Sequence, residues 1–305
     1  MTMSDSPLIS VVIPAYNYAK TLSRAVLSVL PQLEGASAEL LVIDDGSTDS
    51  TPQVVDELQA KYPGCFRSIR KPNGGLASVR NLGIVEALGT YLVFLDADDE
   101  MASDGIEALV SHIEAHPESR LVIGAHWSVF PDGRKSLHTP RVLPEGARAR
   151  VRGYLLDKTI SISNGACAMH REVFRVGNYP EQFRNSEDIP VFAQVLARYP
   201  CTVLERPVAL IHKHDDSLRH NVQHAHAVGL KLVEEMFDSP RLPGELHDLR
   251  REYTAQRCLS LFRTFMAVGD VGAAKRYYRE AVRTNWKVLF NLSYTRKALR
   301  LMYRG

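Results

Sequence analysis

The sequence predicts an α/β fold with a mostly parallel, Rossmann-like sheet flanked by helices. Short apolar runs alternate with segments of helical periodicity through about the first 125 residues. Strands that alternate with helices in this way form βαβ units, in which successive strands lie parallel. Polar and turn-forming residues follow each apolar run, at the strand ends where open sheets of this kind bind ligands.

The expected elements follow one another in a regular order. Residues 8–13 are apolar apart from Ser10, which predicts a strand buried on both faces. Pro31 and Pro117 are expected to end helices, and Gly89 to close one. Further strands are expected at residues 40–43, 66–70, 91–95 and 121–124, and helices at 21–30, 50–61, 76–88 and 103–116.

The rest of the chain is less regular until its helical end. Residues 130–134 contain Pro-Asp-Gly, which predicts a hairpin turn. Residues 141–152 are rich in Arg, Pro and Gly and predict a loop. A strand at 160–170, a helix at 190–199 and one or two strands at 202–212 are also expected. We therefore predict an α/β domain over residues 1–218, with halves of about 1–125 and 126–218, and a helical region over 219–305.

Composition excludes several classes of protein. Of the 305 residues, 45% are hydrophobic and 24% are charged, as in ordinary soluble domains, and the net charge of +2 is too small to indicate nucleic acid. The four cysteines form no CxxC pair, which predicts reduced thiols. Because no signal peptide and no run of about 18 apolar residues is recognisable, we expect a cytoplasmic protein that can lie peripherally on the inner face of a membrane.

The acidic pair Asp96 and Asp98 is the sharpest feature of the strand ends. Two carboxylates separated by one residue can share a hard divalent cation, such as Mn²⁺ or Mg²⁺, that keeps positions open for phosphate oxygens. The alternative is that these acids only begin a loop and cap the helix from Ser103. The second acidic strand end, at Asp44 and Asp45, favours the metal.

Other polar residues at the strand ends suit a nucleotide. Tyr16 can stack on a base, and Asp45 can accept a hydrogen bond from a base N–H. The alternative for residues 44–49 is a turn followed by a helix cap, with Asp49 the strongest candidate for the cap. Arg80 can bind phosphate or a backbone carbonyl, although a lone arginine on a helix is more often a surface residue.

Common nucleotide motifs are missing. The first strand is followed by Pro-Ala-Tyr-Asn rather than by the GxGxxG of a dinucleotide-binding domain, and no GxxxxGK[ST] occurs. A phosphatase with an aspartyl nucleophile would carry DxD after the first strand, whereas here it follows the fourth. These classes are therefore excluded.

The strand-end motifs resemble those of family 2 glycosyltransferases of the GT-A fold, in order and in spacing, over about residues 8–217. The motifs that carry the resemblance are Ile13–Asn17, Ile43–Asp49, Asn73–Gly75, Arg80–Asn81 and Leu95–Asp99. The resemblance implies an inverting enzyme that moves a sugar from a nucleotide diphosphate donor to a hydroxyl of a glycan or lipid-linked acceptor. Polysaccharide or lipopolysaccharide synthesis at a bacterial surface is the expected setting. A uridine carrier is the family's commonest choice, and a thymidine carrier stays open.

The resemblance also implies roles for single residues. Asp96 contacts the ribose or sugar, and Asp98 binds Mn²⁺ or Mg²⁺. The residues implied to hold the nucleoside are Pro14, Tyr16, Asn17, Asp45, Asn73 and Arg80. His214, in a segment that resembles HxxS, reaches the metal or the diphosphate, with His212 and His220 as alternatives.

Glu187 and Asp188 resemble the family's ED motif, in which the aspartate is the catalytic base. Asp188 lies at the predicted start of a helix, where the helix dipole favours an ionised carboxylate. Glu187 is expected to orient the base or the acceptor. The alternative is that one of the two merely caps the helix. Asn164 and His170 are equally compatible with an acceptor site and with a core strand.

The C-terminus is basic and aromatic. Residues 275–305 contain nine Lys or Arg residues, and Glu280 is the only acid. A basic amphipathic helix with aromatic residues suits an anionic membrane surface. The alternative is a helical cap with a solvated charged face, whereas no motif supports nucleic-acid binding.

Two other functions compete with sugar transfer. A sugar nucleotidyltransferase also uses an acidic metal site, but it needs a basic triphosphate-binding loop near the first strand. A catalytically silent nucleotide-sugar-binding scaffold would tolerate loss of Asp96, Asp98 or Asp188, and all three acids are present.

Overall fold

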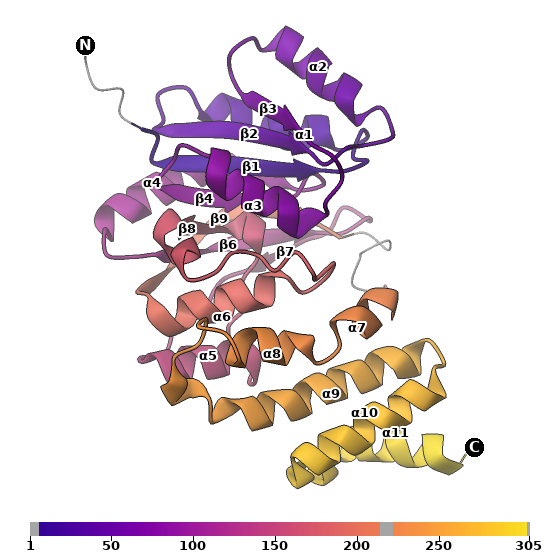
Figure 1. The fold of residues 1–305 in the computed structure, drawn as a ribbon. Helices are drawn as coiled ribbons and strands as arrows, with labels where there is room; N and C mark the ends of the chain where they lie inside the picture. Colours follow the sequence, from indigo (N-terminus) through magenta and orange to yellow (C-terminus); the bar gives the residue numbers. More distant parts are fainter. Residues whose placement is uncertain (1–5, 214–221, 304–305) are drawn as a thin grey trace. The chain divides into compact units, whose positions relative to one another are not determined.

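The computed structural model describes residues 6–213 and 222–303, which divide into two compact units (Figure 1). The sheet unit comprises residues 1–145, 160–181 and 199–215, and the helical unit comprises 146–159, 182–198 and 216–305. The helical unit thus takes in two segments that precede residue 218 in the sequence. The domain boundary at residue 218 stays a prediction.

Within the described residues, nine strands form a single sheet in the sheet unit. Their order is β3-β2-β1-β4-β8-β6-β9-β5, and β7 pairs with β6. The strands are β1 (Ile9–Ala15), β2 (Ala38–Asp44), β3 (Arg67–Arg70), β4 (Tyr91–Phe94), β5 (Glu100–Met101), β6 (Leu121–Val129), β7 (Lys135–His138), β8 (Cys167–His170) and β9 (Cys201–His212).

The first four of these strands are parallel, as predicted. Strand β1 pairs in parallel with β2 and with β4, and β2 pairs in parallel with β3. Beyond β4 the sheet is mixed, because β8 runs antiparallel to both β4 and β6 while β9 runs parallel to β6. The mostly parallel sheet is therefore confined to its N-terminal half.

The core of the sheet unit explains why these segments form strands and helices. All seven residues of β1 are buried, which its apolar sequence permits on both faces. Leu22, Ala25, Val26 and Val29 line one face of α1 and pack into the same cluster as β1. The helices of this unit are α1 (Leu22–Val29), α2 (Thr51–Lys61), α3 (Leu76–Glu86) and α4 (Gly105–Ala115).

Helix α1 ends just before Pro31, as predicted, and the 3₁₀ turn Leu30–Gln32 follows it. Two other local predictions need correction. The loop expected at 141–152 contains most of helix α5 (Ala147–Leu155), which buries Val151 and Leu155. The strand expected at 160–170 is only β8, and the 3₁₀ turn Asn164–Ala166 precedes it.

The helical unit buries aromatic side chains between its long helices. Besides α5 it contains α6 (Asp188–Arg198), α7 (Val222–Val228), α8 (Lys231–Phe237), α9 (Leu249–Ala267), α10 (Val271–Thr284) and α11 (Leu292–Tyr303). Phe262 and Phe265 of α9 pack with Tyr277 and Tyr278 of α10 in its core. The Arg152 guanidinium of α5 donates to both carboxylate oxygens of Glu252 on α9, at 2.7 and 2.9 Å.

Across the part of the chain that the structure describes, no helix combines the length and the apolar character that a bilayer span requires.

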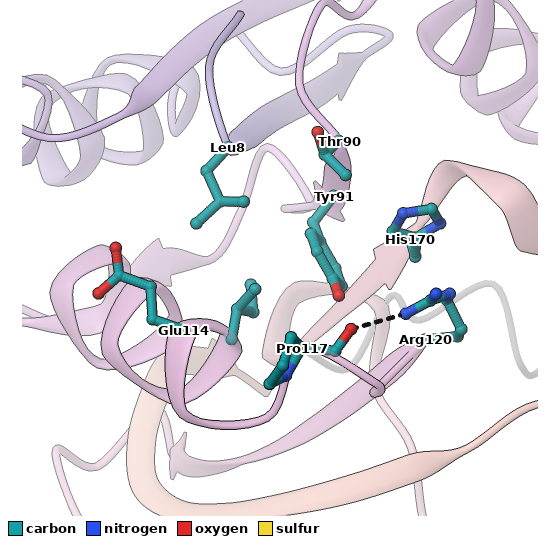
Figure 2. A pocket seen from close by; sticks show the side chains of 8 residues that line it. Leu8, Thr90, Tyr91, Glu114, Pro117, Arg120 and His170 are labelled. Atoms are coloured by element: carbon teal, nitrogen blue, oxygen red, sulfur yellow. Dashed lines mark hydrogen bonds between the residues drawn. The ribbon is translucent and has the colours of Figure 1, made fainter. Parts of the chain in front are cut away.

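A shallow cavity of about 290 Å³ lies in the sheet unit, near the amino ends of β1 and β4 (Figure 2). It is lined by Leu8, Thr90, Tyr91, Ile113, Glu114, Pro117, Arg120 and His170. The Tyr91 hydroxyl donates to the Ser119 carbonyl at 2.6 Å, and Arg120 donates to the Pro117 carbonyl at 2.9 Å. Of the residues considered for a functional site in the sequence analysis, only His170 lies here.

Gly89 has a different role from the one predicted. Helix α3 already ends at Glu86, and the extended residue Ala87 follows it. A Cβ atom added to Gly89 would lie 2.6 Å from the Ser10 nitrogen and 2.7 Å from the Ile9 carbonyl carbon, both in the backbone of β1. The glycine is therefore required by the close approach of two backbone segments.

We predict that Gly89→Ala lowers the free energy of unfolding by about 2–3 kcal/mol, because neither backbone segment can move aside cheaply. Urea unfolding measures this change. Gly244→Ala is the matched control, since no atom lies within 4 Å of its added Cβ, and a change below about 0.5 kcal/mol is expected there. Equal stability of the two variants would contradict the close approach.

Candidate active site

Parallel pairing brings the polar ends of β1, β2 and β4 to one edge of the sheet. Ala15 of β1 is paired with Asp44 of β2, and Val12 of β1 with Phe94 of β4. The loops that follow these strands therefore begin side by side. The strand ends and these loops carry residues 14–17, 44–49 and 96–99, as the sequence analysis anticipated.

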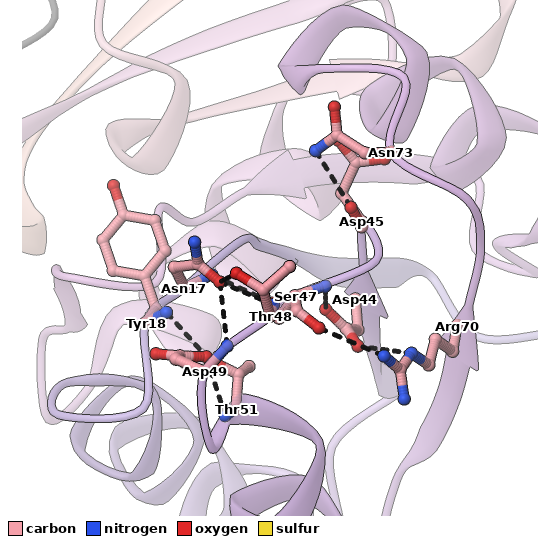
Figure 3. Close-up of polar contacts among 10 residues, drawn as sticks. All are labelled: Asn17, Tyr18, Asp44, Asp45, Ser47, Thr48, Asp49, Thr51, Arg70 and Asn73. Carbon is pink, nitrogen blue, oxygen red and sulfur yellow. Dashed lines mark hydrogen bonds and ion pairs between the residues drawn. The ribbon is translucent and has the colours of Figure 1, made fainter.

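The loop after β1 is bound to the loop after β2 through Asn17 (Figure 3). The Asn17 side-chain oxygen accepts hydrogen bonds from the Thr48 nitrogen at 2.8 Å and from the Asp49 nitrogen at 3.3 Å. The Asn17 backbone nitrogen donates to the Ser47 hydroxyl at 2.9 Å. Asn17 has a positive φ of 61°, which asparagine tolerates better than most residues. This side chain positions the two loops, whereas Tyr16 beside it is 43% exposed.

Asp44 and Asp49 accept hydrogen bonds that stabilise the turn after β2. The Asp44 carboxylate accepts from the Ser47 nitrogen at 2.9 Å and pairs with Arg70 at 3.2 Å. Asp49 accepts from the Thr51 nitrogen at 2.9 Å, at the start of α2, and from the Ala19 nitrogen at 3.2 Å. Burial raises the pKa of Asp49, but the hydrogen bonds from Thr51 and Ala19 together outweigh burial and lower the pKa below its ordinary value.

The buried carboxylate of Asp45 holds the loop before α3. It is 2% exposed and accepts from Lys71 Nζ at 2.7 Å, from the Gly74 nitrogen at 2.9 Å and from the Gly75 nitrogen at 2.7 Å. The Asn73 side chain donates to the Asp45 carbonyl at 3.0 Å (Figure 3). The carboxylate predicted to meet a base N–H is thus bound to this loop by three donors of the chain itself.

Gly46 permits this close packing. Its φ is +72°, and an added Cβ would lie 2.9 Å from the Asn73 nitrogen. Both the backbone conformation and the lack of space exclude a larger residue.

Arg80 is buried, which excludes the alternative of a solvated surface arginine. Its side chain is 3% exposed and contacts Asp96 at 3.2 Å, while the Asp96 side chain is 41% exposed. The guanidinium carbon lies 5.3 Å from the centre of the Tyr179 ring. Arg80 therefore connects α3 to the acidic end of β4.

Asn81 extends this connection to residues 179–181. Its side chain donates to the Tyr179 carbonyl and to the Glu181 carboxylate, both at 2.9 Å, and accepts from the Tyr179 nitrogen at 3.0 Å. The Tyr179 hydroxyl donates to Asn164 at 2.8 Å. Tyr179 is absent from the predicted site residues. A tyrosine between Asn178 and Pro180, shortly before the ED motif, was the available signal.

The residues after β4 form a crowded acidic cluster. Arg24 donates to the Asp98 carbonyl and also pairs with Glu100 at 3.4 Å. Asp99 is 4% exposed and accepts from the His212 nitrogen at 2.7 Å. Burial, followed by the negative charges of Asp96 and Asp98, raises the pKa of Asp99 to about 8.

Tyr18 faces the same cluster and was missed by the sequence analysis. Burial raises the pKa of its hydroxyl, and the charges of Asp98, Asp96 and Asp99 raise it further. Its nitrogen donates to the Thr51 hydroxyl at 2.9 Å. A tyrosine directly after the Pro-Ala-Tyr-Asn motif was the available signal.

The chemistry of this donor set fits a divalent cation. Asp96 and Asp98 offer hard oxygen ligands at a strand end, and a cation between them would offset the repulsion among the crowded carboxyl groups. Among the residues that the structure describes, no cluster of three or more His, Cys, Asp or Glu side chains has the arrangement of a complete metal site. His212 Nε2 lies 2.7 Å from Glu100, whereas His214 and His220 lie outside the described residues.

The predicted base belongs to the helical unit. Asp188 is the first residue of α6, as expected, and Glu187 before it is 6% exposed. Ser186 has a positive φ of 70°, so the turn that presents both acids is strained. Burial raises the pKa of Tyr253 to about 12, and the charge of Asp188 contributes in the same direction. Tyr253 therefore lies close enough to Asp188 to sense its charge.

The chain belongs to glycosyl transferase family 2, because the model of this family matches residues 10–177. This match includes the loops after β1, β2 and β4, with their acidic residues up to Asp99. The family is one of glycosyltransferases, which is the enzyme class predicted from the sequence.

Curated relatives match only part of the chain. Chondroitin synthase of Pasteurella multocida is 37% identical over 127 residues, 42% of this chain but 13% of that protein. GgaB of Bacillus subtilis, a minor teichoic acid biosynthesis protein, is 32% identical over 130 residues, 42% of this chain and 14% of its own length. An uncharacterized glycosyltransferase of Rickettsia conorii is 31% identical over 192 residues, 62% of this chain and 30% of that protein. The chain spans less than a third of each of these three proteins.

Solved structures confirm the GT-A fold. S. aureus TarS residues 1–349, in complex with UDP-GlcNAc, matches with a TM-score of 0.66 at 19% identity over 90% of this chain and 81% of that one. GalNAc-T7 with UDP, GalNAc and Mn²⁺ matches with a TM-score of 0.54 at 19% identity over 82% of this chain and 55% of that one.

We predict that Asp45→Ala lowers the free energy of unfolding by about 2–4 kcal/mol even without ligand. The substitution leaves Lys71 and two backbone N–H groups without their acceptor. Urea unfolding in the presence of chelator measures the change. Asp56→Ala, at an exposed position of α2, should change stability by less than about 0.5 kcal/mol. A fully stable Asp45→Ala variant would show that the carboxylate does not hold the loop.

Proposed function

We propose that the chain is an inverting glycosyltransferase that moves a sugar from a UDP-sugar to a hydroxyl of a glycan or lipid-linked acceptor. The observation that carries the proposal is the juxtaposition, in a family 2 domain, of the Asp96-x-Asp98 pair with the loops after β1 and β2. Relatives named for chondroitin, hyaluronan and minor teichoic acid synthesis support a polysaccharide acceptor.

The donor nucleotide binds along the edge formed by the loops after β1, β2 and β3. The exposed ring of Tyr16 stacks on the base, beside Pro14 and Asn73. Asp45 and Asn17 keep these loops in register, as their hydrogen bonds indicate. Arg80 orients Asp96, whose exposed carboxylate meets the ribose or sugar. The TarS structure with UDP-GlcNAc supports uridine over thymidine as the carrier.

A divalent cation, Mn²⁺ or Mg²⁺, is held by Asp98, with His214 as the second protein ligand. When bound, it supplies Lewis-acid neutralisation of the departing diphosphate. The GalNAc-T7 structure with UDP and Mn²⁺ supports this choice. Arg24, bound to the Asp98 carbonyl, keeps the acidic turn in place.

Asp188 removes the proton from the acceptor hydroxyl as the hydroxyl attacks the anomeric carbon. Its place at the first position of α6 favours the ionised state that a base requires. One base suffices because the leaving group is a nucleoside diphosphate, which needs no protonation of the kind that a glycosidase provides with a second carboxyl. Glu187, buried beside it, positions the base.

Asp188→Asn is expected to reduce sugar transfer by about 10²- to 10⁴-fold while leaving the affinity for UDP unchanged, because only the proton acceptor is lost. A screen of UDP-sugars with polysaccharide and lipid-linked acceptors measures transfer, and calorimetry measures binding. Asp56→Asn, exposed on α2, controls for the loss of one carboxylate. Transfer at the wild-type rate by Asp188→Asn would exclude this residue as the base.

Asp98→Asn is expected to remove the dependence of UDP binding on metal. The wild-type protein should bind UDP more tightly with Mn²⁺ than with chelator, whereas the variant should bind equally in both. Titration calorimetry measures all four affinities. If Mn²⁺ strengthened UDP binding to the variant as much as to the wild type, the metal would have another ligand.

A further inference from the structure

The turn between α10 and α11 exposes large apolar side chains. This 3₁₀ turn spans Trp286–Phe290 and leads into α11. Trp286 is 56% exposed, Phe290 71% and Leu292 61%. The two aromatic rings contact each other, with their centres 5.5 Å apart. A group of exposed apolar residues of this kind indicates a surface that contacts another protein, a ligand or a membrane.

The core of the helical unit does not use these side chains. Val288 of the turn and Ala298 of α11 are buried in that core, and Tyr294 packs against it. On α11, Leu292, Arg296 and Leu299 recur at helical spacing and share the opposite, exposed face. The local fold is therefore complete without Trp286 and Phe290.

The surroundings of the turn are strongly basic. Residues 281–305 contain six Lys or Arg residues and no acid. Among those that the structure describes, Arg283, Lys287, Arg296, Lys297 and Arg300 are exposed. We call Trp286, Lys287, Phe290, Leu292, Arg296 and Lys297 together the aromatic–basic patch.

We propose that the aromatic–basic patch binds an anionic membrane surface. Tryptophan and phenylalanine side chains enter the interface at the level of the lipid headgroups, and lysine and arginine pair with the headgroup phosphates. A second copy of the same patch is disfavoured as the partner, because it would place cations against cations. A lipid surface accepts exposed aromatic rings without needing a preformed pocket. This inference does not depend on the sugar-transfer activity.

Vesicle co-sedimentation of the full chain tests the proposal. Phosphatidylcholine vesicles containing 30% phosphatidylglycerol should bind the protein at least tenfold more tightly than pure phosphatidylcholine vesicles. Raising the salt concentration should weaken this binding. Trp286 emission should shift to shorter wavelength on binding, measured in a Trp127→Phe background because the chain has only two tryptophans.

Two pairs of substitutions separate the apolar and the charged contributions. Arg296→Gln/Lys297→Gln should weaken binding to the anionic vesicles roughly 30-fold, about fivefold for each charge. Trp286→Ser/Phe290→Ser should weaken it at least tenfold. Lys61→Gln/Lys231→Gln removes two exposed lysines from α2 and α8 and should leave binding unchanged. Circular dichroism and thermal unfolding confirm that each variant is folded.

Several results would overturn the proposal. Equal binding to both kinds of vesicle, or to neither, would contradict an anionic lipid partner. If wild-type protein bound polyglutamate in a salt-dependent way but no vesicle, the patch would belong to an acidic protein. Undiminished vesicle binding by the folded Trp286→Ser/Phe290→Ser variant would likewise exclude the patch as the contact.

Discussion

The arrangement of the proposed nucleotide-binding loops depends on the buried carboxylate of Asp45. It lies directly after β2 and accepts hydrogen bonds from Lys71, Gly74 and Gly75, all in the segment between β3 and α3. The loop that carries Asn73, and the start of the helix that carries Arg80, are thereby fixed to the neighbouring strand. A charged acceptor that is shielded from water makes these bonds strong, and it makes the loss of any partner costly.

A second set of contacts connects α3 to the acidic residues that follow β4. Arg80 pairs with Asp96 and lies over the Tyr179 ring, and Asn81 binds the backbone of Tyr179. Neighbouring residues of one helix thus hold both the acidic pair and the segment 179–181. Contacts from α3 therefore fix the position of Asp96 in the proposed metal site. The negative charges of Asp96, Asp98 and Asp99 lie close together, which favours the binding of a cation.

In the helical unit, the residues with proposed functions lie in turns. Asp188 begins α6 after a strained residue, Ser186, and the exposed aromatic rings lie in the turn before α11. At Ser186 the packed helices hold a local conformation that the turn would not adopt alone. Helix packing in this unit therefore determines where the proposed base and the proposed membrane contact lie.

The sequence by itself determined strands β1–β4, helices α1–α4 and the strand-end positions of Tyr16, Asp45, Asp96 and Asp98, because periodicity and turn residues act over a few neighbours. Only the tertiary structure decided that Arg80 is buried, that Asp45 is engaged by three donors of its own chain, and that Gly89 lies against β1 instead of closing a helix. It also converted an Arg- and Gly-rich segment into α5, which buries Val151 and Leu155. In each case the deciding contacts join residues far apart in the chain, so no local pattern could reveal them.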